Sequence, residues 1–394
     1  MATYQVAACQ AIGDTLAHWR KFVEFFGGGF TTIGWTAQTG HGELTSTGTG
    51  ATYTITGLAL PTTTLANVTG PYHFKGAWVS GNTYIGGNAL ATTTTDIVTD
   101  GGLSYVHVTA SSSLTSPSGI PGTDTTNWQP IFFEIWKSSG AQSTSHPIYV
   151  RITYTLAGSA FTVGSASTGP GFHFALGTGI DSDGNITGAI TINPASAPFT
   201  NGLQIVAQTG NSATGDMNFA GDSDNFRFMT WRGLATGGYQ WIVVCDRAKT
   251  ASGTDSDAFA YVAQFNMAGT NATGGSQRIG GAILYKPSLG TPANIAFAAS
   301  NPLPGLVGNG SITTTMSQFG ATPPFPIFPP VGYLGNPLLG MVGFQKGDVQ
   351  DGQVMPVWMY GASHNYLASA ANISSGNNNA NGVANSMAPA ILWE

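Results

Sequence analysis

Hydrophobic and polar residues alternate along much of the chain, which is the pattern of strands that bury one face. In the segment IYVRITYT (148–155), the side chains of Ile148, Val150 and Ile152 fall on one face. Asp183-Gly184 predicts a hairpin turn. Runs of β-branched and aromatic residues predict strands at 131–137, 148–155, 171–177, 186–193, 225–231, 239–245 and 259–265. Their close spacing favours antiparallel, sandwich-like sheets over alternating strands and helices.

One helix is predicted near the start of the chain. Asp14 suits its first turn, and Gly27-Gly28-Gly29 predicts its end. Such a helix either covers a sheet of its own chain or docks on a neighbouring subunit. The residues with the spacing of one helix face are Ile12, Leu16, Trp19, Val23 and Phe26.

The amino-acid composition changes from about residue 300, where proline and glycine are frequent and large apolar residues lie between them. Dense proline does not suit central strands, so this region predicts an extended arm. Residues 374–382 predict a flexible loop, and 388–394 a short closing strand. The expected fold is therefore mainly β, with an antiparallel sandwich-like body and one N-terminal helix. The expected domains are 1–70 (helix and first part of the body), 71–130 (an inserted small β module), 131–300 (main body) and 301–394 (Pro/Gly-rich arm and closing strand).

Charged residues make up only 8% of the 394 residues, against about 25% in ordinary globular chains. A surface of Thr, Ser, Asn and Ala can pack against neighbouring subunits with little desolvation cost, so the composition favours a subunit of an oligomer. The alternative with similar composition is a secreted, Thr-rich bacterial surface protein. A net charge of −6 without any basic run speaks against nucleic-acid partners, and no apolar run is long enough for membrane insertion. The first ten residues have no signal-peptide pattern, so we expect synthesis in the cytoplasm.

The inserted segment 71–130 has a distinct order of motifs. Trp78 is followed by GNTY (81–84), then by DGGLSYVHV (100–108), by two prolines and by Trp128. This order resembles the chitin-binding-like modules of carbohydrate-binding families five and twelve. The segment ALATTTTDIVT (89–99) is longer than the family pattern, which puts the loop geometry and the glycan affinity in doubt.

The resemblance implies a role for four aromatic residues, namely Trp78, Tyr84, Tyr105 and Trp128. Sugar rings have apolar faces that stack on exposed aromatic rings, while their hydroxyl groups bond to polar side chains. A module this small also needs aromatic residues for its own core. The sequence leaves both possibilities open: most of the four rings form the core, or at least one exposed pair stacks on a host surface glycan.

The rest of the chain resembles a recurrent virion-protein type of tailed bacteriophages. The matching pieces are IGWTAQTGHGEL (33–44), FEIWKSSGAQSTSHPIYVRITY (133–154), FALGTGIDSDGNITG (174–188), YLGNPLLG (333–340) and AILWE (390–394). The resemblance implies a structural subunit of the virion, in the tail or baseplate, that assembles with copies of itself and with other virion proteins. Closed cyclic symmetry is expected. The alternative is a receptor-binding protein of the tail-fibre type that adheres to host glycan.

Catalytic signatures are missing from the sequence, so we expect no enzyme and no cofactor. A glycosidase needs two carboxylates that face one cleft. The acidic pairs Asp222/Asp224 and Asp255/Asp257 lie in turn-like sequence instead.

A weak metal alternative remains at IDSDGN (180–185), where Asp181, Asp183 and Asn185 alternate as in half of a calcium loop. The twelfth position of that loop would be Ile192 rather than glutamate, so a hairpin turn is favoured.

Overall fold

The structure is a computed structural model that describes part of the chain. The described residues are 1–10, 15–44, 71–86, 95–108, 119–157, 169–188, 203–206, 214–232, 239–267, 278–285, 325–326, 338–345, 349–369 and 387–394. They are mainly β with several antiparallel sheets and one N-terminal α-helix, as the alternating pattern predicts. No described helix has the length and apolar character needed to cross a membrane.

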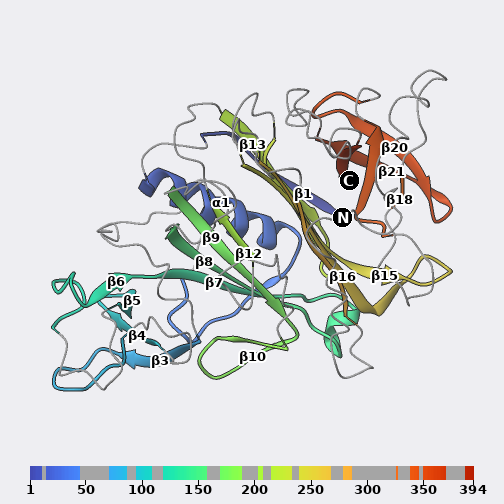
Figure 1. The fold of residues 1–394 in the computed structure, drawn as a ribbon. Helices are drawn as coiled ribbons and strands as arrows, with labels where there is room; N and C mark the ends of the chain where they lie inside the picture. Colours follow the sequence, from blue (N-terminus) through green and yellow to red (C-terminus); the bar gives the residue numbers. More distant parts are fainter. Residues whose placement is uncertain are drawn as a thin grey trace.

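Two sheets form the body (Figure 1). Sheet A has six strands in the order β1 (Ala2–Gln10), β13 (Thr214–Gly221), β14 (Phe226–Arg232), β15 (Tyr239–Lys249), β16 (Asp255–Met267) and β17 (Arg278–Tyr285). Sheet B has the order β12 (Leu203–Val206), β9 (Gly169–Gly177), β8 (Tyr149–Ala157), β7 (Phe132–Lys137) and β2 (Thr36–Ala37). All pairs in both sheets are antiparallel.

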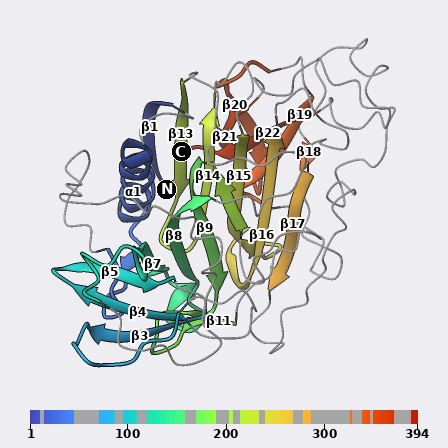
Figure 2. The ribbon, with the colours of Figure 1, turned by 60° about the vertical axis from the view of Figure 1, so that its left-hand side comes forward.

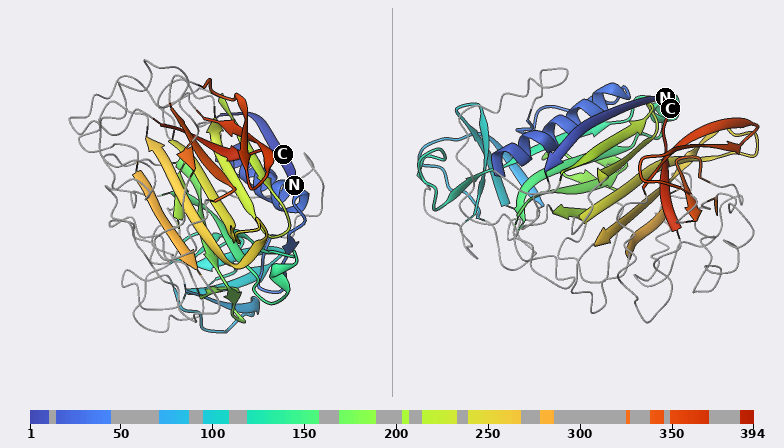
Figure 3. Two further views of the ribbon diagram at one scale, coloured as in Figure 1. Left: turned by 90° about the vertical axis from the view of Figure 1, so that its right-hand side faces the viewer. Right: turned by 90° about the horizontal axis from the view of Figure 1, so that it is seen from above.

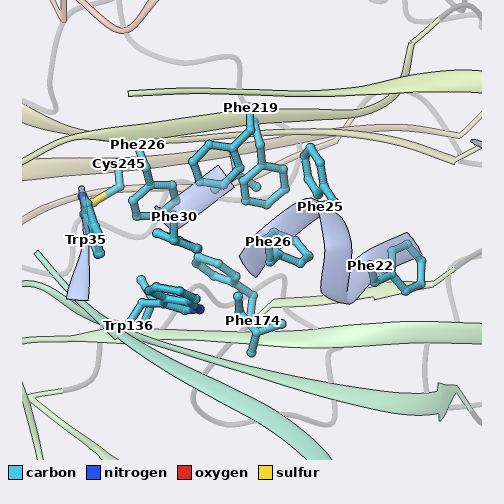
Figure 4. Close-up of a cluster of buried hydrophobic side chains, with 14 of the residues drawn as sticks. Phe22, Phe25, Phe26, Phe30, Trp35, Trp136, Phe174, Phe219, Phe226 and Cys245 are labelled. Atoms are coloured by element: carbon cyan, nitrogen blue, oxygen red, sulfur yellow. The ribbon is translucent and has the colours of Figure 1, made fainter. Parts of the chain in front are cut away.

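Helix α1 (Thr15–Thr32) lies between the two sheets (Figures 1 and 4). Its buried phenylalanines contact both sides: Phe26 meets Phe228 of sheet A at a ring distance of 5.2 Å and Phe174 of sheet B at 6.3 Å. Phe30 stacks on Trp136 of sheet B at 5.5 Å. Helix and sheets therefore share one aromatic core, in which burial of apolar surface is the main stabilising term.

The helix continues through the three glycines at which the sequence predicted its end, and that prediction was wrong. A Cβ at Gly29 would lie 2.6 Å from the Phe219 ring, and one at Gly28 would clash with the Tyr4 ring. The glycines thus permit close contact between the helix and strands β1 and β13. Their packing role outweighs the low helix propensity of glycine, about 1 kcal/mol per residue.

The outer face of sheet B carries the inserted module (Figure 2). Its sheet has the order β3 (Tyr72–Ala77), β4 (Thr95–Asp100), β5 (Leu103–His107) and β6 (Trp128–Pro130). Strands β3 and β4 pair in parallel, which differs from the antiparallel arrangement elsewhere. A two-stranded hairpin, β10 (Gly179–Ile180) and β11 (Ile186–Thr187), lies beside the module at the end of sheet B.

The outer side of sheet A carries a separate C-terminal sheet (Figures 1 and 3). Its order is β18 (Phe325–Pro326), β19 (Met341–Gln345), β22 (Met387–Leu392), β21 (Ala362–Ala368) and β20 (Val354–Met359). The described part of the predicted arm is thus largely sheet, and the closing segment supplies its central strand β22. Most of 301–337 and the loop 374–382 lie outside the described residues.

A buried ion pair joins the C-terminal sheet to sheet A. Arg227 Nη2 donates to Asp246 Oδ1 at 2.8 Å, and both side chains are almost completely buried. The second carboxylate oxygen of Asp246 accepts the backbone N–H of Gly340 at 2.7 Å. The Asp246 carboxylate therefore bridges two strands of sheet A and the start of the C-terminal sheet.

We expect Gly29→Ala to destabilise the protein by about 1–3 kcal/mol, because the new methyl group must displace the Phe219 ring. At an open helix position the same change stabilises by about 0.5–1 kcal/mol. Urea unfolding followed by circular dichroism measures the difference. The control is Thr31→Ala on the exposed side of the same helix, which should leave stability unchanged or slightly raised. A gain in stability for Gly29→Ala would contradict the packing described here.

Candidate functional site

The inserted module contains the four aromatic residues that the sequence nominated for sugar stacking. Tyr84, Tyr105 and Trp128 form one buried cluster with Val98, and each is exposed by 9% or less. Trp78 packs against this cluster from the edge and is only partly buried. Three of the four rings are therefore core residues and present no face to a ligand, which corrects their nomination as stacking residues.

The polar atoms of Tyr84 and Trp128 are satisfied within the module. The Trp128 indole N–H donates to the Gly119 carbonyl at 2.9 Å. The Tyr84 hydroxyl accepts the backbone N–H of Val79 at 2.9 Å. The rings of Tyr84 and Trp128 meet edge to face at 5.2 Å. A small sheet needs this much aromatic area to form a core, so the residue types that resemble a binding pattern are used for packing.

The module also shares a second core with sheet B. Ile97 and Val106 of the module pack in one cluster with Ile131, Phe133 and Ile135, and all five side chains are exposed by 2% or less. Only Ile131 separates β6 from β7. The segment 71–130 is therefore continuous with the body in its packing, and removing it would expose the outer face of β7.

Arg151 lies at the centre of this junction. The plane of its guanidinium stacks between the rings of Tyr72 and Phe133, with its Cζ 4.3 and 4.1 Å from their centroids. Nη1 donates to the Gly184 carbonyl at 3.0 Å. The residue is 4% exposed, and burial lowers the pKa of its guanidinium, an effect that nearby Tyr72, Glu43 and Asp181 offset in part. This arginine therefore connects sheet B, the module and the β10–β11 hairpin.

The turn of that hairpin contains the residues of the weak metal alternative. Asp181 Oδ1 accepts the backbone N–H groups of Asp183 and Asn185, each at 2.9 Å. Asp183 Oδ1 accepts the Phe74 N–H at 3.1 Å, and Asn185 both accepts from Tyr72 N–H at 2.8 Å and donates to the Tyr72 carbonyl at 2.7 Å. The oxygens thus bind N–H donors of the turn and of β3, an arrangement that favours the hairpin turn over a calcium loop.

Acidic pairs elsewhere also have structural partners. Asp222 Oδ1 accepts the N–H groups of Asp224 and Asn225 in the turn between β13 and β14. Asp224 accepts the Ser143 hydroxyl, and Asp255 pairs with Lys249. Within the described ranges, no group of three or more His, Cys, Asp or Glu side chains is placed to hold a metal ion.

Glu134 on β7 is a buried carboxyl that the sequence analysis did not single out. It faces the aromatic core and is 2% exposed. The Trp136 indole donates to Oε2 at 3.1 Å and the Tyr154 hydroxyl at 3.2 Å, while Oε1 has no hydrogen-bond partner. Burial raises the pKa of the Glu134 carboxyl from 4.5 to about 8, so the group is protonated in the folded protein at neutral pH.

Comparison with models of protein families, with curated proteins and with solved structures gave no match for this chain. The residues that sequence reasoning missed are Arg151, Glu134 and the exposed Trp358. An isolated charge inside an alternating strand could have indicated the first two, since such a residue on a buried face requires specific partners.

We expect Asn185→Ala to loosen the module, because it removes the two hydrogen bonds to the backbone of Tyr72. The loss should be about 1–3 kcal/mol, and amide hydrogen exchange in β3 should accelerate while sheet A stays protected. Ser182→Ala in the same turn is the control, because Ser182 is exposed. Unchanged exchange in β3 would show that the turn does not fasten the module.

The buried Glu134 makes stability depend on pH. The folded state keeps this proton up to about pH 8, whereas the unfolded chain releases it near 4.5. Stability should therefore fall by about 1.4 kcal/mol per pH unit as pH rises between these values, and the penalty should stay constant above them. In Glu134→Gln this contribution to the pH dependence of the unfolding free energy should vanish. Urea unfolding at several pH values between about 4.5 and 8 measures it. The variant Glu24→Gln, which removes a partly exposed carboxyl of the helix, should keep the wild-type slope. Equal slopes in wild type and Glu134→Gln would refute the assignment.

Proposed function

We propose that this chain is a structural subunit of a tailed-bacteriophage particle, in the tail or baseplate, which assembles as a symmetric homo-oligomer. The observation that carries the proposal is the scarcity of charge on the surface. The chain has 12 Lys and Arg and 18 Asp and Glu, which is 30 charged side chains in 394 residues.

Several of these few charges are inside the protein. Arg151, Arg227, Arg247, Asp96, Asp246 and Glu134 are each exposed by 4% or less. The described surface is therefore poorer in charge than the composition alone suggests. Because few ions must be desolvated, such a surface is suited to contact with other subunits.

The position of the module supports an outward display. In Figures 1 and 3 the module and the C-terminal sheet lie at opposite ends of the molecule, with the two body sheets between them. A subunit that uses its body for contacts with its neighbours would leave the module at the periphery. The motifs that resemble the virion-protein type are spread over the body and the C-terminal sheet, around the inserted module.

The alternative is a receptor-binding protein of the tail-fibre type that adheres to host glycan. It requires exposed aromatic rings, and Tyr84, Tyr105 and Trp128 are buried in the module. The structural role therefore has the better support from the module, and a glycan-binding role would need another surface.

The experiment is to measure the mass of the purified full-length chain by light scattering over a range of concentration and salt. We expect one defined oligomer that persists in high salt, because an interface without ion pairs is not weakened by screening. Mass spectrometry of particles purified from lysates of producing cells should contain this chain as a major component. A monomer at all concentrations, or particles without the chain, would contradict the proposal.

A further inference from the structure

The hairpin of β20 and β21 at the far end of the C-terminal sheet presents an unusual surface (Figure 1). Its two strands are joined by a tight turn in which Tyr360 and Gly361 have φ values of 50° and 78°. Val357, Met355 and Met359 pack against the core of the C-terminal sheet. This packing fixes the hairpin, so the opposite face is a rigid support.

The opposite face carries the most exposed large hydrophobic residue that the structure describes. Trp358 is 73% exposed, and Val354 on the same face is 45% exposed. Ser363 lies directly across from Trp358, and Asn365 directly across from Pro356; both are exposed. A tryptophan ring left in water has a free-energy cost, which binding of an apolar surface would relieve.

A second tryptophan borders the same face. The backbone N–H of Trp393 donates to the Asn365 carbonyl at 2.8 Å. Tyr366 pairs with Leu392, so the next residue, Trp393, continues this register across from Asn365. Trp393 is partly exposed. The two tryptophans therefore flank Asn365, separated by roughly 12 Å according to ordinary strand spacings.

The polar groups on this face are uncharged and available. Among the described residues, the Ser363 hydroxyl and the Asn365 side-chain amide have no hydrogen-bond partner. His364 lies on the opposite face by register and pairs with Glu394. The Glu394 carboxylate also accepts the backbone N–H of Asn365 at 3.3 Å. Apolar rings beside neutral donors and acceptors suit a neutral ligand with both apolar faces and hydroxyl groups.

Two features disfavour a protein partner at this face. The hydrogen bond from the Ala368 N–H to the Gln353 carbonyl shows which residues of β20 bond to β21. Every second residue of β20 directs its backbone to the free edge of the sheet, and Pro356 is one of these. Proline there prevents a further strand from pairing along β20. The ring of Trp358 covers about 150–250 Å², whereas a stable interface needs about 800 Å² from each partner.

We propose that this face, formed by Trp358, Ser363, Asn365 and Trp393, binds a neutral carbohydrate chain. The Trp358 ring stacks on the apolar face of one sugar ring, and Ser363 and Asn365 bond to its hydroxyl groups. Trp393 contacts a neighbouring sugar ring on the other side of Asn365. This inference concerns a ligand of the chain and holds whether or not the chain is a subunit of a particle.

The test is a titration of the full-length protein with soluble chito-, malto- and manno-oligosaccharides, followed by tryptophan fluorescence and calorimetry. At least one oligosaccharide should bind saturably. Trp358→Ala should weaken that binding by roughly tenfold or more with an unchanged melting temperature, because the side chain is exposed. Trp358→Tyr should retain most of the affinity, since it keeps a ring. Asn365→Ala should weaken binding less than Trp358→Ala does.

The control is Ile120→Ala, which removes another exposed apolar side chain, 50% exposed, from the module and should leave binding unchanged. Binding by none of the oligosaccharides, or binding that Trp358→Ala does not weaken, would overturn the proposal. Light scattering of the same samples separates this proposal from subunit assembly. If Trp358→Ala dissociates the oligomer and no sugar binds, the face is a contact between copies and the carbohydrate site is disproved.

Discussion

The packing of α1 between sheets A and B is the constraint on which the rest of the structure depends. Phe26 and Phe30 contact both sheets, Phe25 contacts sheet A, and the glycines on the same helix let β1 and β13 approach closely. Because the helix packs against the inner face of each sheet, the outer face of each sheet can carry a further layer. Those outer faces carry the module and the C-terminal sheet, which hold the surfaces of functional interest.

A buried arginine lies at the junction between each body sheet and the layer on its outer face. On sheet B, Arg151 stacks between Tyr72 and Phe133 and reaches the hairpin carbonyl of Gly184. On sheet A, Arg227 pairs with Asp246, which in turn accepts the N–H of Gly340. A charge that is buried requires specific partners, so these contacts fix the orientation of the added layers. The same placement removes charge from the surface and so links the fold to the proposed assembly.

The strands could be predicted from the sequence because alternation is a local property. The runs at 148–155 and 239–245 correspond to β8 and β15, and Asp183-Gly184 does lie in a hairpin turn. The end of α1 could not be predicted, because Gly28 and Gly29 respond to rings from β1 and β13, which are distant in sequence. Burial of Tyr84 and Trp128 depends likewise on tertiary packing. A motif gives residue types and spacing but does not tell which aromatic rings are exposed. The exposure of Trp358 depends on packing and could not be predicted from the sequence.

The central claim is that α1 is an integral part of the core and does not open separately from the sheets. Amide hydrogen exchange of the native protein, measured for the helical residues from Phe22 to Phe30, tests it most directly. The account predicts that these amides exchange only by global unfolding, with the same free energy as the central strands β14 and β15. Exchange in α1 at a clearly lower free energy, while both sheets remain protected, would contradict it.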